Sequence, residues 1–364
     1  MRNTILGKII KDNSQINNLK QQILNKEQLL MQTQDPTQKQ IIIQEITTLK
    51  QQLQEYDKKR TTLIKEIEDF TGRRLITYFS INGMIIDRDA HVIEDFLISN
   101  DLKKFDILIF SPGGLTDAAE KMIKICQTRT STNGNFDFRI IITQHAKSAA
   151  TLFALGSSKI LLCECAELGP VDPQIIVYAP NGEMIRDSAH QIFYGSEQYR
   201  AGKSQADLLL LSKYDPIAIK RADTAIKHTK DIIIKRIYTN PNLRIGYSGD
   251  SDIEKELKIF TDHGALYSHG RPIYYEDIKD FQYCKNKFIQ KFDDYFITDE
   301  NKNNSEIAAI QKKLHELTIR SLEVVRADRE PIIDRTGNLV GFNKVALKLF
   351  ETSNGLILTK EVLN

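Results

Sequence analysis

Between residues 73 and 163 the chain alternates short apolar runs rich in β-branched residues with amphipathic segments of helical period. Apolar runs that lack a polar alternation are typical of strands buried on both faces. Regular succession of such strands and helices predicts an α/β fold, in which helices cover a mostly parallel sheet through right-handed crossovers. The predicted strands are residues 75–80, 105–110, 138–143 and 159–163, and the predicted helices are residues 87–100, 118–129 and 149–155.

Residues 1–72 have a different texture, because they are rich in Gln, Lys, Ile and Leu and contain Pro36 as their single proline. Apolar side chains after Pro36 recur at alternating intervals of four and three, broken only at Arg60, as in the seam of a coiled coil. Asp35-Pro36 ends one helix and starts the next. The segment is therefore expected to form an α-helical coiled-coil hairpin. It would serve as an arm for oligomerisation or partner recruitment, or it would fold against its own body.

The rest of the chain gives weaker signals. Residues 188–237 read as predominantly helical, residues 306–325 as a last helix, and residues around 336–338 as the turn of a β-hairpin. Together these patterns predict three domains: the helical hairpin over 1–72, the α/β domain over 73–285 and a C-terminal extension over 286–364.

Charge and composition exclude several classes of function. Fifty basic and 48 acidic residues give a net charge of +2 without local clustering, which argues against nucleic acid as a partner. Apolar runs stay well below the roughly eighteen residues of a membrane span. The N-terminal residues lack the apolar core of a signal peptide, so a cytoplasmic location is expected. Four cysteines without paired spacing predict reduced thiols, with no metal site and no cofactor.

Two turns at strand ends carry the residues suited to chemistry. Ser111-Pro112-Gly113-Gly114 follows one predicted strand and precedes a helix, so backbone N–H groups are expected at the carboxyl edge of the sheet, where open α/β sheets bind ligands. Ser148 follows the next strand and precedes a helix, as an exposed nucleophilic hydroxyl does. Ala150 stands where the nucleophile-elbow pattern has glycine, and Ser148 taken alone is equally suited to capping the helix.

Read together, the two turns predict a more specific site. Adjacent parallel strands would bring the backbone amides of Gly114 and Ala149, with Gly113 as a further donor, around one point beside the Ser148 hydroxyl. Amides converging on a developing negative charge form an oxyanion hole, which serves acyl transfer. The pattern therefore favours acyl transfer, with the Ser148 hydroxyl as the nucleophile.

The segments Ser111-Pro-Gly-Gly-Leu-Thr-Asp, His145-Ala-Lys-Ser-Ala-Ala-Thr and Glu167-Leu-Gly-Pro-Val-Asp-Pro follow one another in this order. These three motifs resemble the serine dehydrogenase proteinase family. The resemblance covers about residues 73–280, including a motif at residues 208–216 and residues 268–273. That family is related to signal peptide peptidase A and to the proteolytic subunit of Clp protease, within the crotonase-like superfamily. The resemblance implies a crotonase/Clp-protease-like core and a serine-type endopeptidase that acts on peptides or proteins and assembles into homo-oligomers.

The resemblance implies Ser148 as the nucleophile but leaves the general base open. Clp-type relatives use a histidine, which would fall near Val171-Asp172, where this sequence has none. Signal-peptide-peptidase relatives use a lysine, and a lysine accepts a proton only when burial keeps it uncharged. Lys203 leads as the partner in a Ser-Lys dyad, and Lys220 and His190 are the alternatives.

Two rival functions follow from the same residues. Ala150 and the open choice of base favour a catalytically inactive module that binds peptides or partner proteins on this scaffold. A thioester-processing enzyme that uses only the oxyanion hole is a further hypothesis, although it does not require a serine at position 148. If the chain is a peptidase, an extended peptide is expected to pair with the strand edge near residues 113–116.

Overall fold

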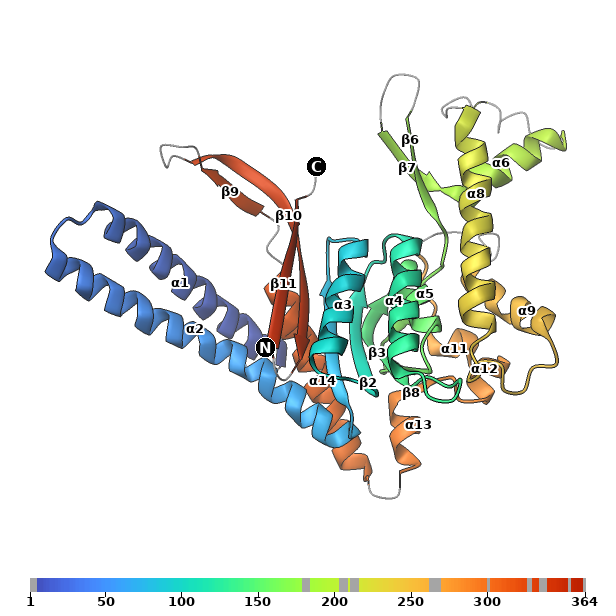
Figure 1. Ribbon diagram of the computed structural model, residues 1–364, viewed down its shortest axis with the longest axis horizontal. Helices are drawn as coiled ribbons and strands as arrows, with labels where there is room; N and C mark the ends of the chain where they lie inside the picture. The colour runs from blue at the N-terminus through green and yellow to red at the C-terminus, as the bar shows by residue number, and fades with distance from the viewer. Residues whose placement is uncertain are drawn as a thin grey trace. The chain divides into compact units, whose positions relative to one another are not determined.

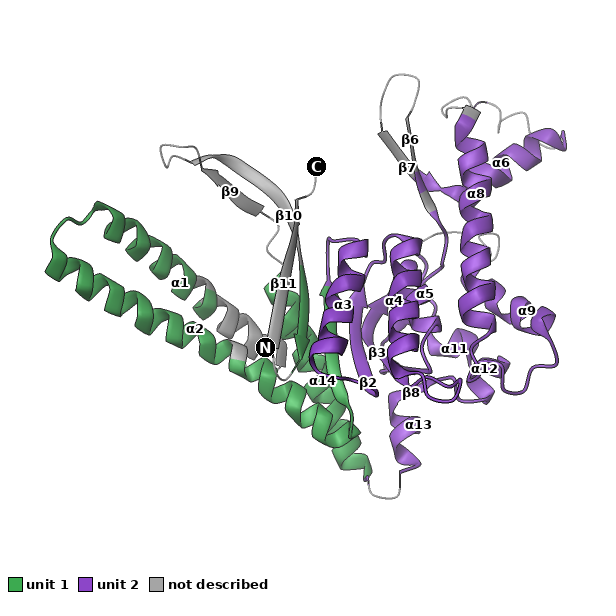
Figure 2. Cartoon of the chain, viewed as in Figure 1, with its two compact units in different colours: residues 1–79, 303–364 green, residues 80–302 purple. Residues whose placement is uncertain are grey.

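The chain is a mixed α/β protein, shown as a computed structural model in Figure 1. The structure describes residues 5–178, 184–202, 209, 216–261, 270–299, 302–325, 329–333, 339–352 and 355–362. Contacts between Cα atoms divide it into two compact units, residues 1–79 with 303–364 and residues 80–302 (Figure 2). The first unit thus joins both ends of the chain. The domain boundaries near residues 72 and 285, expected from composition, stay predictions.

A parallel sheet forms the core of the second unit. Its strand order is β2 (Phe105–Ser111), β3 (Phe138–Ala146), β4 (Lys159–Leu162) and β8 (Ile289–Lys291), with parallel pairing throughout. The short strand β5 (Glu167–Leu168) pairs with the end of β3. Every residue of β2 is buried, as expected for a strand covered on both faces. The parallel sheet predicted from the apolar runs is confirmed.

The crossover helices also lie where the sequence predicts them. They are α3 (Asp87–Ser99), α4 (Thr116–Thr130) and α5 (Ala149–Leu155). Helix α4 packs on both α3 and α5, and Figure 1 shows α3 and α4 side by side across the sheet. Each of these helices begins directly after a turn at the carboxyl edge of the sheet. The residues of these turns therefore lie along that edge.

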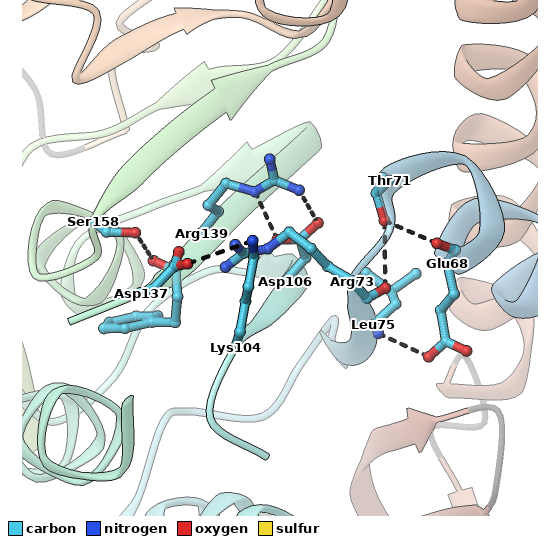
Figure 3. Close-up of polar contacts among 10 residues, drawn as sticks. Glu68, Thr71, Arg73, Leu75, Lys104, Asp106, Asp137, Arg139 and Ser158 are labelled. Carbon is cyan, nitrogen blue, oxygen red and sulfur yellow. Dashed lines mark hydrogen bonds and ion pairs between the residues drawn. The ribbon is translucent and has the colours of Figure 1, made fainter. Parts of the chain in front are cut away.

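A buried ion pair fixes the register of β2 and β3 near their starts (Figure 3). Arg139 Nε donates to Asp106 Oδ1 at 2.7 Å, and Nη2 donates to Oδ2 at 2.6 Å. The two residues are partners in the strand ladder, and their side chains are 5% and 0% exposed. A slip of one residue would separate these charges in surroundings without water, which makes the register costly to change.

The remainder of the second unit is partly helical, as predicted, but it begins with a hairpin that the sequence did not predict. Strands β6 (Gln174–Tyr178) and β7 (Met184–Ser188) pair antiparallel. Runs of five residues give little periodic signal, which is why the sequence did not predict this hairpin. The predicted helical stretch begins at Ser188, the last residue of β7 and the N-cap of the helix that follows. The helices that follow are α6 (Ala189–Arg200), α8 (Pro216–Ile232), the π-helix η1 (Ile233–Tyr238), α9 (Asp250–Thr261), α11 (Tyr275–Ile278), α12 (Gln282–Lys285) and α13 (Phe292–Ile297).

The first unit contains the two long helices α1 (Ile5–Gln32) and α2 (Pro36–Thr71), which pack against each other (Figure 1). Asp35 caps α2 by accepting a hydrogen bond from the Thr37 amide at 2.9 Å, and proline at the first helical position suits this start. A helical hairpin is therefore present, while its coiled-coil packing stays a prediction. The apolar cluster between the helices consists of Ile23, Ile42 and Ile46, with Leu30, Leu49 and Leu53 packed against it.

In the C-terminal part of the first unit a helix is followed by antiparallel strands, where the sequence predicts a last helix and one β-hairpin. Strand β10 pairs antiparallel with both β9 and β11. The predicted turn at residues 336–338 lies outside the described residues. The elements are β1 (Arg74–Ser80), α14 (Asn304–Val325), β9 (Arg329–Ile333), β10 (Leu339–Thr352) and β11 (Gly355–Val362).

Arg60, which interrupts the apolar seam of α2, forms a buried ion pair with Glu351 of β10. The two side chains are 5% and 3% exposed, and Arg60 Nε lies 3.0 Å from the Glu351 carboxylate. Nearby, Ile64 and Ile67 are fully buried, and α2 packs on α14. This end of the helical hairpin is therefore folded against the C-terminal part of its own unit, whereas Ile41 near the other end is 54% exposed.

Three further features of the described residues bear on function: membrane-spanning helices, cysteine thiols and clusters of metal-binding side chains. None of the described helices combines the length and apolar character needed to cross a membrane. The four cysteines are free thiols, of which Cys126 and Cys284 are buried and Cys165 is exposed. In the described part of the chain, no three His, Cys, Asp or Glu side chains gather closely enough to hold a metal ion.

Candidate active site

The two turns singled out in the sequence meet at the carboxyl edge of the sheet. Ser111 and Ala146 are partners in the ladder between β2 and β3, and the Lys147 amide donates to the Ser111 carbonyl at 3.0 Å. Two residues beyond that pair, Gly113 and Ser148 pack against each other. A Cβ added to Gly113 would lie 2.7 Å from the Ser148 Cβ and 2.6 Å from the Lys147 carbonyl oxygen, so only glycine fits there.

Ser148 has a strained backbone, with φ at 50° and ψ at −121°. L-residues other than glycine rarely adopt such angles, and the strain costs about 1–3 kcal/mol, which the surrounding structure must offset. Such strain at a strand-to-helix turn is typical of an exposed nucleophile. We call residues 146–149 the Ser148 turn.

The Ser148 side chain is half-buried and does not cap helix α5. It occupies the N-cap position, but its hydroxyl makes no capping hydrogen bond. Within the described part of the chain, the hydroxyl has no hydrogen-bond partner. The helix-cap interpretation, which the sequence left open, therefore gives no reason for a serine at this position.

Two backbone amides near Ser148 are also without partners among the described residues. Ile85 pairs with the strand-like segment beyond β2: its amide donates to the Gly113 carbonyl at 2.8 Å, and its carbonyl accepts from the Leu115 amide at 2.9 Å. In an extended segment successive residues face opposite sides, so the Gly114 amide points away from Ile85. The Ala149 amide is unpaired because it belongs to the first residue of α5.

The Gly113 amide is in a different position, because it is already engaged. It donates to the Ser111 hydroxyl at 3.1 Å. Gly113 has a φ of 102°, which L-residues rarely adopt. Its role in this geometry is close approach to the Ser148 turn, rather than provision of a free donor.

A second segment, residues 167–171, lies against the Ser148 turn, and we call it the wall segment. Its residues Glu167 and Leu168 extend the β3 ladder. Lys147 Nζ lies 2.7 Å from a Glu167 carboxylate oxygen, and a Cβ added to Gly169 would lie 2.5 Å from Lys147 Cδ. The Lys147 side chain thus runs along the wall segment and ends in an ion pair.

The side chain of Thr151 joins the Ser148 turn to the wall segment. Its hydroxyl donates to the Ala146 carbonyl at 2.7 Å and accepts from the Gly169 amide at 3.1 Å. The side chain is fully buried. Sequence reasoning did not identify Thr151, Glu167 or Ile85 as site residues. Thr151 was visible in the quoted motif, but nothing in the sequence indicates which carbonyl and amide it bridges.

His145 packs beside the site, and its ring makes no hydrogen bond with the residues that the structure describes. Its ring lies 4.0 Å, centroid to centroid, from the Phe110 ring. Burial lowers the pKa of His145 below its ordinary value, the charge of Lys147 lowers it further, and Glu167 acts in the opposite direction. A neutral ring packed on an aromatic neighbour is suited to supporting the turn.

The three predicted bases are placed very differently. Lys203, together with most of the 208–216 motif and residues 268–269, lies outside the described residues. Lys220 is exposed on α8. His190 is half-buried on α6 and lines a cavity of about 240 Å³ with Val171, Tyr238 and neighbouring side chains. Asp172, which follows the wall segment, is 3% exposed.

Comparisons with known proteins give a match to one family model and two curated relatives. The sequence model of the family described as ClpP-like SDH-type serine proteinase matches residues 23–226. Two uncharacterized proteins of Methanocaldococcus jannaschii are each 29% identical to the chain, one over 178 residues (49% of this chain and 52% of that protein) and one over 133 residues (33% and 44%). The chain therefore spans about half the length of the curated relatives it matches.

Solved structures of a 1510-N membrane-bound stomatin-specific protease are also similar to part of the chain. A serine-to-alanine mutant of that protease covers 45% of this chain and 74% of its own, with 18% identity and a TM-score of 0.25. A lysine-to-alanine mutant in complex with a substrate peptide covers 45% and 70%, with 19% identity and a TM-score of 0.25.

Proposed function

Because this chain belongs to the family of ClpP-like SDH-type serine proteinases, we propose that it hydrolyses peptide bonds with Ser148 as the nucleophile. The observation that carries the proposal is the strained Ser148 backbone, with φ at 50° and ψ at −121°, in a residue whose hydroxyl does not cap the following helix. Strain of this kind persists where function requires it. The half-buried hydroxyl lies beside Gly113, where a substrate carbonyl would approach.

The amides of Gly114 and Ala149 are proposed to form the oxyanion hole. Both lie next to the contact between Gly113 and the Ser148 turn, and neither has a partner among the described residues. Attack of the Ser148 oxygen on a carbonyl carbon moves negative charge to the carbonyl oxygen, and preorganised N–H donors stabilise that charge. Gly113, whose amide is bonded to Ser111, contributes the space for the carbonyl rather than a donor.

The substrate is proposed to bind as an extended peptide along residues 113–116. Ile85 occupies one edge of this segment through the Gly113 carbonyl and the Leu115 amide. The other edge, which carries the amide and carbonyl of Gly114, remains for a peptide backbone. Recognition by strand addition reads the main chain and suits a peptidase that acts on varied sequences.

Lys203 is proposed as the general base, with Lys220 and His190 as alternatives. A lysine base must be uncharged to accept the Ser148 proton, and burial favours that state. Lys220 is exposed, which supports the choice of Lys203 over Lys220. Lys147 is adjacent in sequence to Ser148, but its ammonium is paired with Glu167.

Homo-oligomerisation is part of the same proposal. Assembly is expected from the resemblance to Clp-type peptidases, and the α1–α2 hairpin is a possible contact with another protomer or a partner protein. Leu29 and Ile41, near the turn of that hairpin, are 49% and 54% exposed, which supports a contact there.

A fluorophosphonate probe and a peptide library test the peptidase proposal. The full chain is expected to acquire the probe at Ser148, located by mass spectrometry, and to cleave peptides. Ser148→Ala is expected to do neither. Ser99→Ala is the matched control, because Ser99 is an exposed serine at the end of α3, and it is expected to behave as the parent.

Two results would contradict the proposal in different ways. Equal labelling of the parent and Ser148→Ala would assign the nucleophile to another residue. Peptide binding by both proteins, with neither labelling nor cleavage, would instead support the catalytically inactive binding module.

A further inference from the structure

We propose that Thr151 is a positioning residue that holds the Ser148 turn in its strained conformation and fixes its distance from the wall segment. The inference rests on the proposed role of Ser148 as nucleophile. It adds a buried side chain whose hydroxyl joins two segments of the site.

The hydrogen bonds of Thr151 are not those of an ordinary helical threonine. Threonine hydroxyls in helices usually donate to the carbonyl four residues earlier, and Thr130 of α4 does so, to Cys126 at 2.8 Å. Thr151 instead reaches the Ala146 carbonyl five residues earlier, at 2.7 Å. The carbonyl four residues earlier, that of Lys147, accepts from the Ala150 amide at 2.9 Å.

The same hydroxyl also accepts a hydrogen bond from the wall segment. Gly169 N donates to Thr151 Oγ1 at 3.1 Å. A hydroxyl has one donor and two acceptor positions, so both bonds are satisfied at once. One buried oxygen therefore connects the last residue of β3, just before the Ser148 turn bends, to the middle of the wall segment.

Strain at Ser148 persists because the residues around it are held on several sides. Two of these restraints are backbone hydrogen bonds, from the Lys147 amide to Ser111 at 3.0 Å and from the Leu152 amide to the Ser148 carbonyl at 3.0 Å. Backbone bonds do not depend on side-chain identity. Thr151 supplies a side-chain restraint, so a substitution there changes the turn without altering Ser148.

The Thr151 hydroxyl holds the wall segment at a fixed distance from the Ser148 turn. Gly169 approaches so close that a Cβ would lie 2.5 Å from Lys147 Cδ and 3.3 Å from Lys147 Cα. Replacing Thr151 by valine would remove the hydroxyl hydrogen bonds of the Gly169 amide and the Ala146 carbonyl, which belong to two buried residues. The segments would separate or rotate to find new partners, and Ser148 would leave its attacking position.

The test compares Thr151→Val, which removes the hydroxyl at nearly constant shape, with Thr151→Ser, which keeps it. Thr130→Val is the matched control, because Thr130 is 3% exposed and loses one hydroxyl hydrogen bond in the same unit. Thr151→Ala replaces the valine variant if that variant does not fold. The measurements are the rate of fluorophosphonate labelling at Ser148, kcat and KM for a peptide, and hydrogen–deuterium exchange over residues 165–171.

Thr151→Val is expected to lower the labelling rate and kcat at least about tenfold with little change in KM, because misplacement of a reacting group affects the chemical step most. Exchange over residues 165–171 is expected to accelerate. Thr151→Ser is expected to restore both, and Thr130→Val is expected to match the parent. Labelling, kcat and exchange that are unchanged in Thr151→Val, or equally impaired in Thr151→Ser, would overturn the proposal.

The exchange measurement separates this inference from the proposed function. A parent chain that does not label at Ser148 overturns the proposed nucleophile. In that case accelerated exchange in Thr151→Val, reversed in Thr151→Ser, supports Thr151 as the connection between the turn and the wall segment, and unchanged exchange overturns it.

Discussion

Gly113 and Ser148 lie in direct contact at the ends of two neighbouring parallel strands, so closely that a Cβ on Gly113 would be 2.7 Å from the Ser148 Cβ. The contact follows from the ladder, because Ser111 and Ala146 are partners two residues earlier. The conformation of the Gly113 turn therefore depends on that of the Ser148 turn. A substitution at Gly113 can be tested through its effect on Ser148.

Gly113→Ala is expected to reduce fluorophosphonate labelling of Ser148 by at least about a hundredfold. The new methyl group would meet the Lys147 carbonyl oxygen at 2.6 Å and the Ala149 nitrogen at 3.0 Å, so the Ser148 turn must shift. Gly134→Ala is the control: Gly134 also has a positive φ, of 82°, but no heavy atom lies within 4 Å of an added Cβ.

Both glycine variants are expected to lose about 1–2 kcal/mol of unfolding free energy from backbone strain. Labelling distinguishes them, because only Gly113→Ala disturbs the Ser148 turn. Labelling that survives in Gly113→Ala at the rate of Gly134→Ala would show that the close contact does not matter for Ser148.

Lys203→Met is expected to lower kcat by about 10²–10⁴-fold, the usual contribution of a general base. Lys220→Met and His190→Gln are the comparisons, and both are expected to keep activity within a few-fold of the parent. Measurement of kcat and KM for one peptide substrate across the three variants identifies the base. Loss of kcat in Lys220→Met or His190→Gln alone would move the assignment to that residue.

Asp106→Ala is expected to reduce the unfolding free energy by about 3–5 kcal/mol, because it leaves the Arg139 guanidinium buried without its charge partner. Urea denaturation followed by circular dichroism measures the change. Asp223→Ala is the control, since the Asp223–Lys227 pair on α8 is partly exposed, and its loss is expected to cost under about 1 kcal/mol.

A double variant, Asp106→Leu with Arg139→Met, is expected to recover most of the stability lost in Asp106→Ala, because it removes both buried charges. If the double variant is as unstable as Asp106→Ala, the ion pair itself stabilises the fold, and the loss in Asp106→Ala does not come only from an unpaired buried charge.

His145 is expected to make the protein less stable as the pH falls below about 6.5. Burial, followed by the charge of Lys147, lowers its pKa from the ordinary 6.5. The unfolded chain then binds more protons than the folded chain between the lowered pKa and 6.5, so unfolding free energy rises with pH across that window, by at most about 1.4 kcal/mol per pH unit.

His145→Gln is expected to flatten the dependence of unfolding free energy on pH just below 6.5. His315→Gln, which changes an exposed histidine on α14, is expected to leave the slope as in the parent. A slope that does not change in His145→Gln would mean that other groups produce the acid sensitivity.

Sequence patterns were sufficient where a local signal decides the structure. Four apolar runs predicted strands that the structure places at β1 to β4, and the helices between them lie within a few residues of their predicted bounds. The contact between Gly113 and the Ser148 turn was also foreseen, because parallel strands bring their carboxyl ends to one edge. The sequence did not predict the hairpin β6–β7, because its strands are short and pair with each other outside the main sheet.

Arg60 shows where a local pattern misleads. In the sequence it is a charged residue that interrupts an apolar seam. In the structure it is buried and paired with Glu351, a residue 291 positions away. No periodicity predicts such a partner, because the pairing depends on how the C-terminal hairpin packs within the unit.

The sequence by itself determined the alternation of strands and helices between residues 73 and 163, the glycines that permit close approach, and a serine at a strand-to-helix turn, because residue types and spacing set these locally. Only the tertiary structure decided the strained conformation of Ser148, the pairing of Ile85 beside Gly114, and the two bonds of the Thr151 hydroxyl. Those depend on segments distant in the chain that meet at one sheet edge, where packing and the need to satisfy buried polar groups select a single arrangement.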